Sequence, residues 1–234
     1  MDTEYLSFSN STTCRAVSIH PHEAIEIAER SSLLALSNDE QSYCGKEIDS
    51  ILYKLRLQTC LALREILNLP NAPINKMPNG KPYLSNRSES LTIAHKDHMI
   101  FVCVHNQGLP IGADVEDENQ VRNWEPFQGR FFNHQDWLLS LRMSQLLSLE
   151  KNTAMLILFT AKEALLKCTE LEIDALKMIF NLEIETSSAQ NIFLTANPEW
   201  RNSIKQFSIE IKRQNNCIFA VCIESNSIEL NEFE

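Results

Sequence analysis

Hydrophobic residues recur at helical spacing over the first 70 residues, which are therefore predicted to be helical. One helix is predicted over 21–36, where apolar positions fall three and four residues apart, and a longer one over 47–68. Residues 70–90 carry four prolines and an Asn-Gly pair, which predicts a turn-rich loop. The first third of the chain is thus expected to hold helices followed by a long irregular connection.

Short apolar runs bounded by polar residues come next, and they predict strands. The predicted strands are Leu91–His95, Ile100–Val104 and Ile111–Glu116. Between 121 and 169 helical spacing returns, and two helices are predicted, one containing Trp137–Leu149 and the other Met155–Leu166. Alternation then predicts three further strands, which are Lys177–Ile184, Gln206–Lys212 and Cys217–Ile223.

Helices followed by strands therefore occur twice along the chain. This order predicts an α+β protein built from two similar halves, residues 1–110 and 111–234. The chain is long enough for one large domain or for two small ones.

Composition changes this picture little. Apolar residues make up 44% and charged residues 22%, and no apolar run reaches the ~18 residues of a membrane span. The first residues are acidic and polar, unlike a secretory signal, so a cytoplasmic protein without a membrane partner is predicted. The seven cysteines are odd in number and lack Cys-x-x-Cys spacing, which predicts reduced and mostly buried thiols.

A net charge of −10 disfavours nonspecific binding to nucleic acid, so no nucleic-acid partner is predicted. It also constrains any site for an acidic ligand, which has to be a local basic patch on an acidic body.

The sequence Ile111-Gly112-Ala113-Asp114-Val115-Glu116 is the most informative segment. On a strand, Asp114 and Glu116 point to the same face, so two carboxylates lie side by side. Two interpretations are open. The residues form a solvated strand end that leads into an acidic turn, or a hard cation such as Mg²⁺ sits between them.

A second candidate is the helical segment Phe159–Lys167, which contains Lys162, Glu163 and Lys167. Glu163 and Lys167 are four residues apart and share a helix face. One interpretation is a surface salt bridge. The other is a polar face lining a cleft, because apolar residues surround the pair along the helix.

Two smaller features complete the set. Gly80-Lys81-Pro82 fixes an ammonium group in a turn, and His95 ends a predicted strand. Either residue is suited to binding phosphate, and each also has an ordinary alternative as a solvated lysine or a hydrogen-bonded histidine.

Taken in order, these segments resemble the Sfp-type 4'-phosphopantetheinyl transferases, and the region 45–80 resembles the enterobactin-synthase member. The family pattern is a Gly-Lys-Pro loop, a strand ending in Ser-His, then G(I/V)D(I/V)E and (F/W)xxKE(A/S)xxK. The resemblance is strong over Gly80–Lys167, moderate over 45–80 and weak at both ends.

The resemblance implies a Mg²⁺-dependent enzyme that transfers phosphopantetheine from coenzyme A to a serine of an apo acyl or peptidyl carrier protein. It implies that Asp114, Glu116 and Glu163 bind the metal and that Glu163 is the base that activates the serine. It implies that Lys167 contacts the reacting phosphate, accompanied by Lys162. The bottom-up chemistry agrees, because serine attack on a diphosphate needs a charge-neutralising group and a base.

Coenzyme A is expected to contact the first half, and its implied ligands there are Lys46, Arg56, Lys81, Pro82, Ala94 and His95. Arg56 corresponds to the arginine that contacts the 3'-phosphate. The usual serine before the histidine is replaced by Ala94, and the basic cluster before Arg56 is reduced to Lys46. The resemblance also implies an active site in the cleft between the halves and a monomer, since one chain contains both halves.

Two other functions compete with this one. In the first, the chain is a transferase-like module without turnover that only docks a carrier protein or synthase, and the reduced basic cluster favours this hypothesis. In the second, the chain is a Mg²⁺-dependent phosphohydrolase, in which water replaces serine as the nucleophile. The carrier and its pathway (fatty-acid, polyketide, nonribosomal-peptide or siderophore synthesis) are not specified by any segment.

Overall fold

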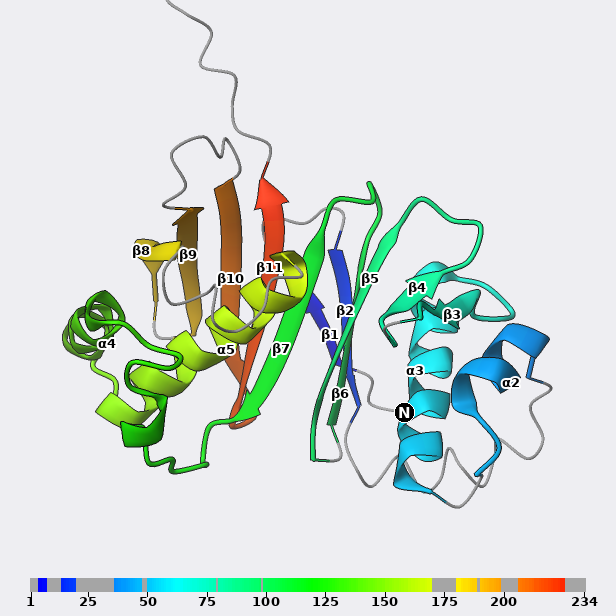
Figure 1. Cartoon of the computed structure of the whole chain (residues 1–234), viewed down its shortest axis with the longest axis horizontal. Coiled ribbons are helices and arrows are strands. Elements are labelled where there is room, and N and C mark those ends of the chain that lie inside the picture. The colour runs from blue at the N-terminus through cyan, green and yellow to red at the C-terminus, as the bar shows by residue number, and fades with distance from the viewer. Residues whose placement is uncertain are drawn as a thin grey trace, which may run out of the picture. The chain divides into compact units, whose positions relative to one another are not determined.

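The computed structural model describes residues 4–7, 14–19, 36–47, 50–78, 80–97, 99–169, 180–188, 190–198 and 206–225. The chain divides into two compact units, 1–111 and 112–234 (Figure 1). Each unit combines helices with an antiparallel or mixed sheet, so the α+β prediction is confirmed. The similarity of the two halves stays a prediction. The helix predicted over 21–36 falls almost wholly outside the described residues.

The first unit is built on a four-stranded sheet. Its strands, in spatial order, are β1 (Glu4–Ser7), β2 (Cys14–Ile19), β6 (Met99–His105) and β5 (Ser90–Lys96). Neighbouring strands are antiparallel throughout. The helix α3 (Ile51–Leu67) packs against β2 and β6, and α2 (Asn38–Cys44) packs against α3.

The prediction that the first 70 residues are helical is wrong where β1 and β2 lie. The strand β2 pairs with β6, and Cys14 is opposite His105. Its structure therefore depends on a partner about 90 residues further along the chain, which a search for local periodicity does not detect.

Capping residues set the ends of the two helices described in this unit. Ser37 and Glu40 form a reciprocal capping box at the start of α2. Ser50 accepts a hydrogen bond from the Tyr53 amide at the start of α3, which is why this helix begins at residue 51 and not at 47. Asn68 adopts the left-handed conformation that ends it.

The predicted loop over 70–90 contains a hairpin made of β3 (Ile74–Lys76) and β4 (Pro82–Leu84). Its turn needs Gly80, which has a φ of +86° and donates its amide hydrogen to the Met77 carbonyl. The Gly-Lys-Pro segment is thus the end of a tight turn that enters a short strand.

The second unit is built on a five-stranded sheet. Its strands, in spatial order, are β7 (Ile111–Asp117), β11 (Cys217–Ser225), β10 (Gln206–Gln214), β9 (Asn191–Pro198) and β8 (Phe180–Ser187). All but β9 had been predicted. A 3₁₀ turn, η1 (Glu125–Phe127), precedes the helices α4 (His134–Leu147) and α5 (Lys151–Thr169).

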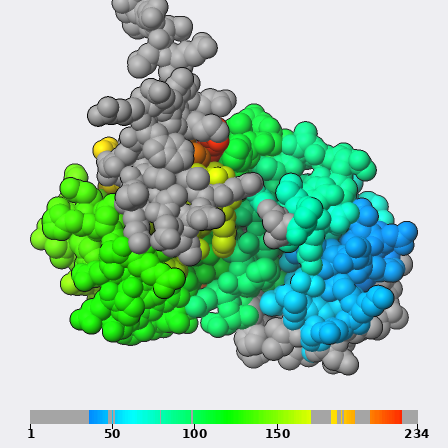
Figure 2. All heavy atoms as spheres, viewed as in Figure 1, coloured from blue at the N-terminus to red at the C-terminus, as the bar shows by residue number. Residues whose placement is uncertain are grey.

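The helix α5 packs on β10 and β11, and α4 packs on α5 and β8. Most side chains of α5 are buried, as predicted from its apolar surroundings, while Phe159, Glu163 and Lys167 on one face are partly exposed. The helix α4 is the outer layer, and its leucines Leu138, Leu141 and Leu146 are about half exposed. Figure 2 shows this segment, in bright green, on the surface of the second unit.

The six described cysteines outside β2 are buried and unbridged, so the prediction that they are mostly buried is confirmed. No helix within the described part of the chain is long and apolar enough to cross a membrane.

Gly112 allows β7 to lie directly against α5. A Cβ atom built at this position would lie 1.9 Å from the Ala164 carbonyl oxygen and 2.4 Å from the Cys168 amide nitrogen. Both are backbone atoms of a buried helix, so neither can move aside without shifting the helix. Residues two and four positions further along β7, Asp114 and Glu116, point to the same face and are thereby brought onto α5.

We expect Gly112→Ala to lower the free energy of unfolding by about 3 kcal/mol or more, because the added methyl overlaps the α5 backbone. Gly80→Ala is the control. A Cβ at that position meets no atom within 4 Å, so only its positive φ opposes the substitution, at a cost of about 1–2 kcal/mol. Urea unfolding of both variants measures the difference. Equal destabilisation would show that the close approach of β7 to α5 is not needed.

Candidate active site

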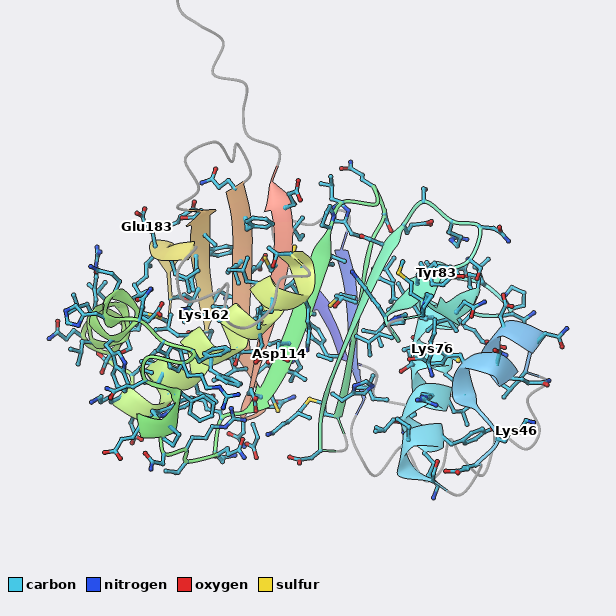
Figure 3. The ribbon with its side chains drawn as sticks, viewed as in Figure 1. Lys46, Lys76, Tyr83, Asp114, Lys162 and Glu183 are labelled. Atoms are coloured by element: carbon cyan, nitrogen blue, oxygen red, sulfur yellow. The ribbon has the colours of Figure 1, made fainter. Side chains whose placement is uncertain are left out.

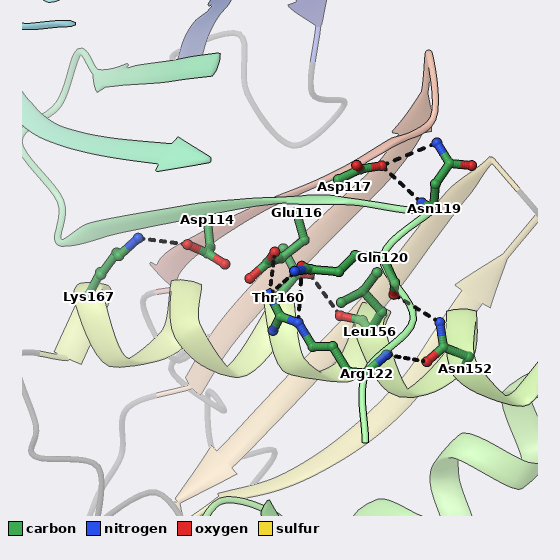
Figure 4. Close-up of polar contacts among 10 residues, drawn as sticks. All are labelled: Asp114, Glu116, Asp117, Asn119, Gln120, Arg122, Asn152, Leu156, Thr160 and Lys167. Atoms are coloured by element: carbon green, nitrogen blue, oxygen red, sulfur yellow. Dashed lines mark hydrogen bonds and ion pairs between the residues drawn. The ribbon is translucent and has the colours of Figure 1, made fainter. Parts of the chain in front are cut away.

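Two buried carboxylates lie side by side on β7. Asp114 and Glu116 are 7% and 6% exposed, so the interpretation as a solvated strand end is wrong. Ionised carboxylates at this depth require positive partners. Figure 4 shows both side chains on the face of β7 that lies over α5.

Asp114 has its positive partner on α5. The Lys167 ammonium donates to Asp114 Oδ1 at 2.7 Å, and about a third of the lysine side chain is exposed. The alternative in which Glu163 and Lys167 form a surface salt bridge with each other is therefore wrong. Lys167 joins the helix to the strand instead, and its remaining exposure leaves it accessible to a ligand.

Glu163 lies within electrostatic reach of both β7 carboxylates. Burial raises the pKa of Glu163 above its usual value, and the negative charges of Asp114 and Glu116 raise it further against the opposing effect of Lys167. Burial likewise raises the pKa of Asp114, with the Glu116 charge adding to it and Lys167 opposing it. The three carboxylates are thus one cluster whose negative charges disfavour one another.

The donor atoms of this cluster suit a divalent cation. Asp114 Oδ2 is buried and has no hydrogen-bond partner, and the Glu163 side chain makes no hydrogen bond or ion pair with another described residue. Carboxylate oxygens are the ligands that Mg²⁺ prefers. In the conformation seen, however, no three His, Cys, Asp or Glu side chains within the described ranges converge closely enough to hold a metal ion. The chemistry of the donors fits the ion, while two of them are engaged by cations.

Arg122 is the second of these cations, and no motif in the sequence points to it. Its Nη2 donates to Glu116 Oε2 at 2.7 Å and to Gln120 Oε1 at 2.8 Å (Figure 4). The guanidinium also lies over the Phe159 ring, 4.6 Å from its centroid. The aromatic residue that opens the Phe159–Lys167 segment therefore supports a cation that holds a cluster carboxylate.

Lys162 requires a correction. The resemblance implied that it accompanies Lys167 at the ligand, but its side chain is fully buried. Its ammonium donates to Asp136 Oδ2 at 2.5 Å and to the Phe131 carbonyl at 3.3 Å. Burial lowers the pKa of Lys162, and the Asp136 charge opposes that shift. This lysine joins α5 to the start of α4 and is not placed to touch a ligand.

A group of cations in the first unit surrounds the end of α2. Arg56 Nη1 donates to the Cys44 carbonyl at 3.4 Å, and Lys76 Nζ donates to the Tyr43 carbonyl at 3.2 Å. Burial lowers the pKa of Lys76, and the nearby charge of Arg56 lowers it further, so the two cations lie close enough to repel. The exposed Lys46 follows two residues after Cys44, and Figure 3 labels Lys46 and Lys76 beside α2 and α3.

Lys76 was missed in the sequence because it stands alone before the turn. The hairpin of β3 and β4 is what brings it back to α2. It supplies a basic side chain where the cluster before Arg56 had seemed reduced to Lys46.

The remaining predicted ligands of the first unit lie on β4 and β5. Lys81 and Pro82 are partly exposed at the start of β4, and His95 is exposed near the end of β5. Ala94 is 1% exposed and lies opposite Phe101 on β6. Its methyl group cannot make the hydrogen bond of the usual serine, and a contact between this residue and coenzyme A stays a prediction.

Two buried carboxylates and a partly buried one, balanced by an arginine and a lysine, have the chemistry of a site for a cation and a phosphate group. Residues 110–222 match the family model of the 4'-phosphopantetheinyl transferase superfamily. This part of the chain is therefore a domain of the 4'-phosphopantetheinyl transferase superfamily, and the predicted family is confirmed at that level. No curated protein matches the chain in sequence.

The match contains the three carboxylates of the cluster, Asp114, Glu116 and Glu163, and the adjacent Lys167. It begins one residue before β7, so the cations around α2 and the Gly-Lys-Pro turn lie outside it. Transfer of a phosphopantetheine group is the general activity that the superfamily supports.

We expect Lys162→Met to lower the free energy of unfolding by about 3–5 kcal/mol, because it leaves the Asp136 carboxylate buried without its cation. The double variant Lys162→Met/Asp136→Asn should be more stable than the single one, since both charges are then removed. Thermal or urea unfolding measures this order. A stable Lys162→Met protein with weakened coenzyme A binding would return Lys162 to the ligand site.

Proposed function

We propose that this protein is an Sfp-type transferase that moves 4'-phosphopantetheine from coenzyme A to a serine of an apo acyl or peptidyl carrier protein. The observation that carries the proposal is the carboxylate cluster of Asp114, Glu116 and Glu163 with Lys167 beside it. The superfamily match over the same residues supports it.

The reaction requires a new bond and a broken one at a single phosphorus. The serine Oγ attacks the phosphorus next to pantetheine, and the bond from that phosphorus to the bridging oxygen of the diphosphate breaks. The electron pair leaves with 3',5'-ADP, and the serine proton passes to a base. Glu163 is the proposed base, because burial and the neighbouring carboxylates raise its pKa and so strengthen its hold on a proton.

The three carboxylates would hold a Mg²⁺ ion, with Asp114 Oδ2 as the donor that is already without a partner. Bound there, the ion would neutralise charge on the diphosphate. Lys167 contributes from the protein itself. Its ammonium is accessible and adjacent to Asp114, where it can stabilise the phosphate oxygens as the negative charge redistributes.

The cations around α2 are the proposed site for the 3'-phosphate of coenzyme A. Arg56 and Lys76 stand close enough to repel each other, and a phosphate between them would relieve that repulsion. Lys46 extends the same positive region into solvent. Lys76 thus compensates for the basic residues that are missing before Arg56. The missing residues were the support for a module that only docks a partner, so that hypothesis is weakened.

We expect Asp114→Asn to lower the kcat/KM for transfer by at least about a hundredfold, because it removes a charged donor from the cluster. Asp117→Asn is the matched control on the same strand. Its carboxylate accepts from the Asn119 amide in the following turn, and activity should be retained. Transfer is measured with a labelled coenzyme A and an apo carrier. Equal activity of the two variants would remove Asp114 from the site.

We expect Arg56→Ala and Lys76→Ala each to raise the KM for coenzyme A by about tenfold and to change the KM for 3'-dephospho-coenzyme A much less. The difference arises because only the former substrate carries the 3'-phosphate. Arg87→Ala, an exposed arginine paired with Glu89, is the control. Equal effects on both substrates would place the 3'-phosphate elsewhere.

A further inference from the structure

Arg122 is held from several directions, although no cluster residue is adjacent to it in sequence. Its Nε and Nη2 both donate to Gln120 Oε1, at 3.2 and 2.8 Å. Asn152 fixes the surrounding loop, because it donates to the Gln120 carbonyl and accepts from the Trp124 indole at 2.9 Å. The guanidinium is therefore oriented before any ligand arrives.

The face of the guanidinium is also supported. It lies 4.6 Å from the centroid of Phe159 and 5.9 Å from that of Trp124. Within this setting its Nη2 takes one oxygen of Glu116 at 2.7 Å. Planar bidentate groups of this kind bind carboxylate and phosphate alike, so a diphosphate can compete for the same arginine.

The charges of the free cluster are nearly balanced without a metal. Lys167 on Asp114 and Arg122 on Glu116 compensate all but one of the three carboxylates. A divalent cation approaching the free protein therefore meets two positive side chains and two engaged ligands. Little attraction remains until one of these ligands is released.

We propose that Arg122 makes binding of the divalent cation conditional on coenzyme A. In the free protein Arg122 holds Glu116 and repels the cation. When the coenzyme diphosphate binds, it draws the guanidinium from Glu116, and that carboxylate becomes available as a ligand. Arg122 would then contact the coenzyme diphosphate and control the availability of Glu116. The inference rests on the proposed function, since it takes Glu116 to be a metal ligand and coenzyme A to be the substrate.

The test is titration of Mn²⁺ into the protein, with and without coenzyme A, followed by the electron paramagnetic resonance signal of free Mn²⁺. Binding of Mn²⁺ to coenzyme A alone is measured and subtracted. In the unmodified protein, coenzyme A should strengthen Mn²⁺ binding by a factor within the usual range for coupled ligands, about 5–150-fold.

Arg122→Gln should bind Mn²⁺ more tightly than the unmodified protein when coenzyme A is absent, because a repelling charge is gone and Glu116 no longer pairs with it. The enhancement by coenzyme A should be at least about fivefold smaller than in the unmodified protein, and the part that remains comes from the direct attraction between the diphosphate and the ion. Arg122→Lys, which retains the charge, should keep an intermediate enhancement. Arg142→Gln removes an exposed arginine from α4 and should change neither quantity.

A merely structural arginine would give a different result. If Arg122→Gln weakens Mn²⁺ binding equally with and without coenzyme A, or leaves the enhancement unchanged, the inference is overturned while the proposed function stands. If coenzyme A fails to enhance Mn²⁺ binding in the unmodified protein, both the inference and the metal assignment fail. Circular dichroism confirms that each variant is folded.

Discussion

The candidate site depends on the close packing of a strand on a helix at a position without a side chain. Because Gly112 has no Cβ, β7 approaches the backbone of α5 at Ala164 and Cys168. The next residues on the same face of β7 are then carried along the helix. Asp114 meets Lys167, and Glu116 lies within reach of Glu163. A larger residue at 112 would separate the two elements and disperse the carboxylates.

Once the carboxylates are gathered, their mutual repulsion has to be compensated. The protein does this with Lys167 and Arg122, each buried in part and each bonded to one carboxylate. The same principle operates at the buried pair of Lys162 and Asp136, where the charges serve packing and not a ligand. Local compensation of this kind allows an acidic chain, with a net charge of −10, to present positive groups to acidic ligands.

Much of this could be predicted from the sequence. The strand period placed Asp114 and Glu116 on one face, and the apolar surroundings of Glu163 showed that α5 is buried. These features depend on residues near one another in the chain. The failures depend on distant partners. The strand β2 forms by pairing with β6, and Lys76 reaches α2 only because the hairpin turns the chain back. Arg122 is held over the ring of Phe159, which lies 37 residues further along the chain.

Lys162 shows the opposite error. It lies within a recognisable motif, yet its burial and its pairing with Asp136 set its role. A motif specifies which residue types occur together, while accessibility specifies which of them can act. Asp114, Glu116, Glu163 and Lys167 stay the proposed site residues, because β7 and α5 bring them together and Glu163 and Lys167 are partly exposed.

The most direct test of the central claim is intact-mass analysis of apo carrier proteins after incubation with this protein, coenzyme A and Mg²⁺, with the released nucleotide quantified. The account predicts a carrier that gains one phosphopantetheine mass, an equal amount of 3',5'-ADP, and the loss of both when a chelator is added. Release of 3',5'-ADP without a carrier would instead indicate a phosphohydrolase. If neither product forms although coenzyme A binds, the transferase assignment is contradicted.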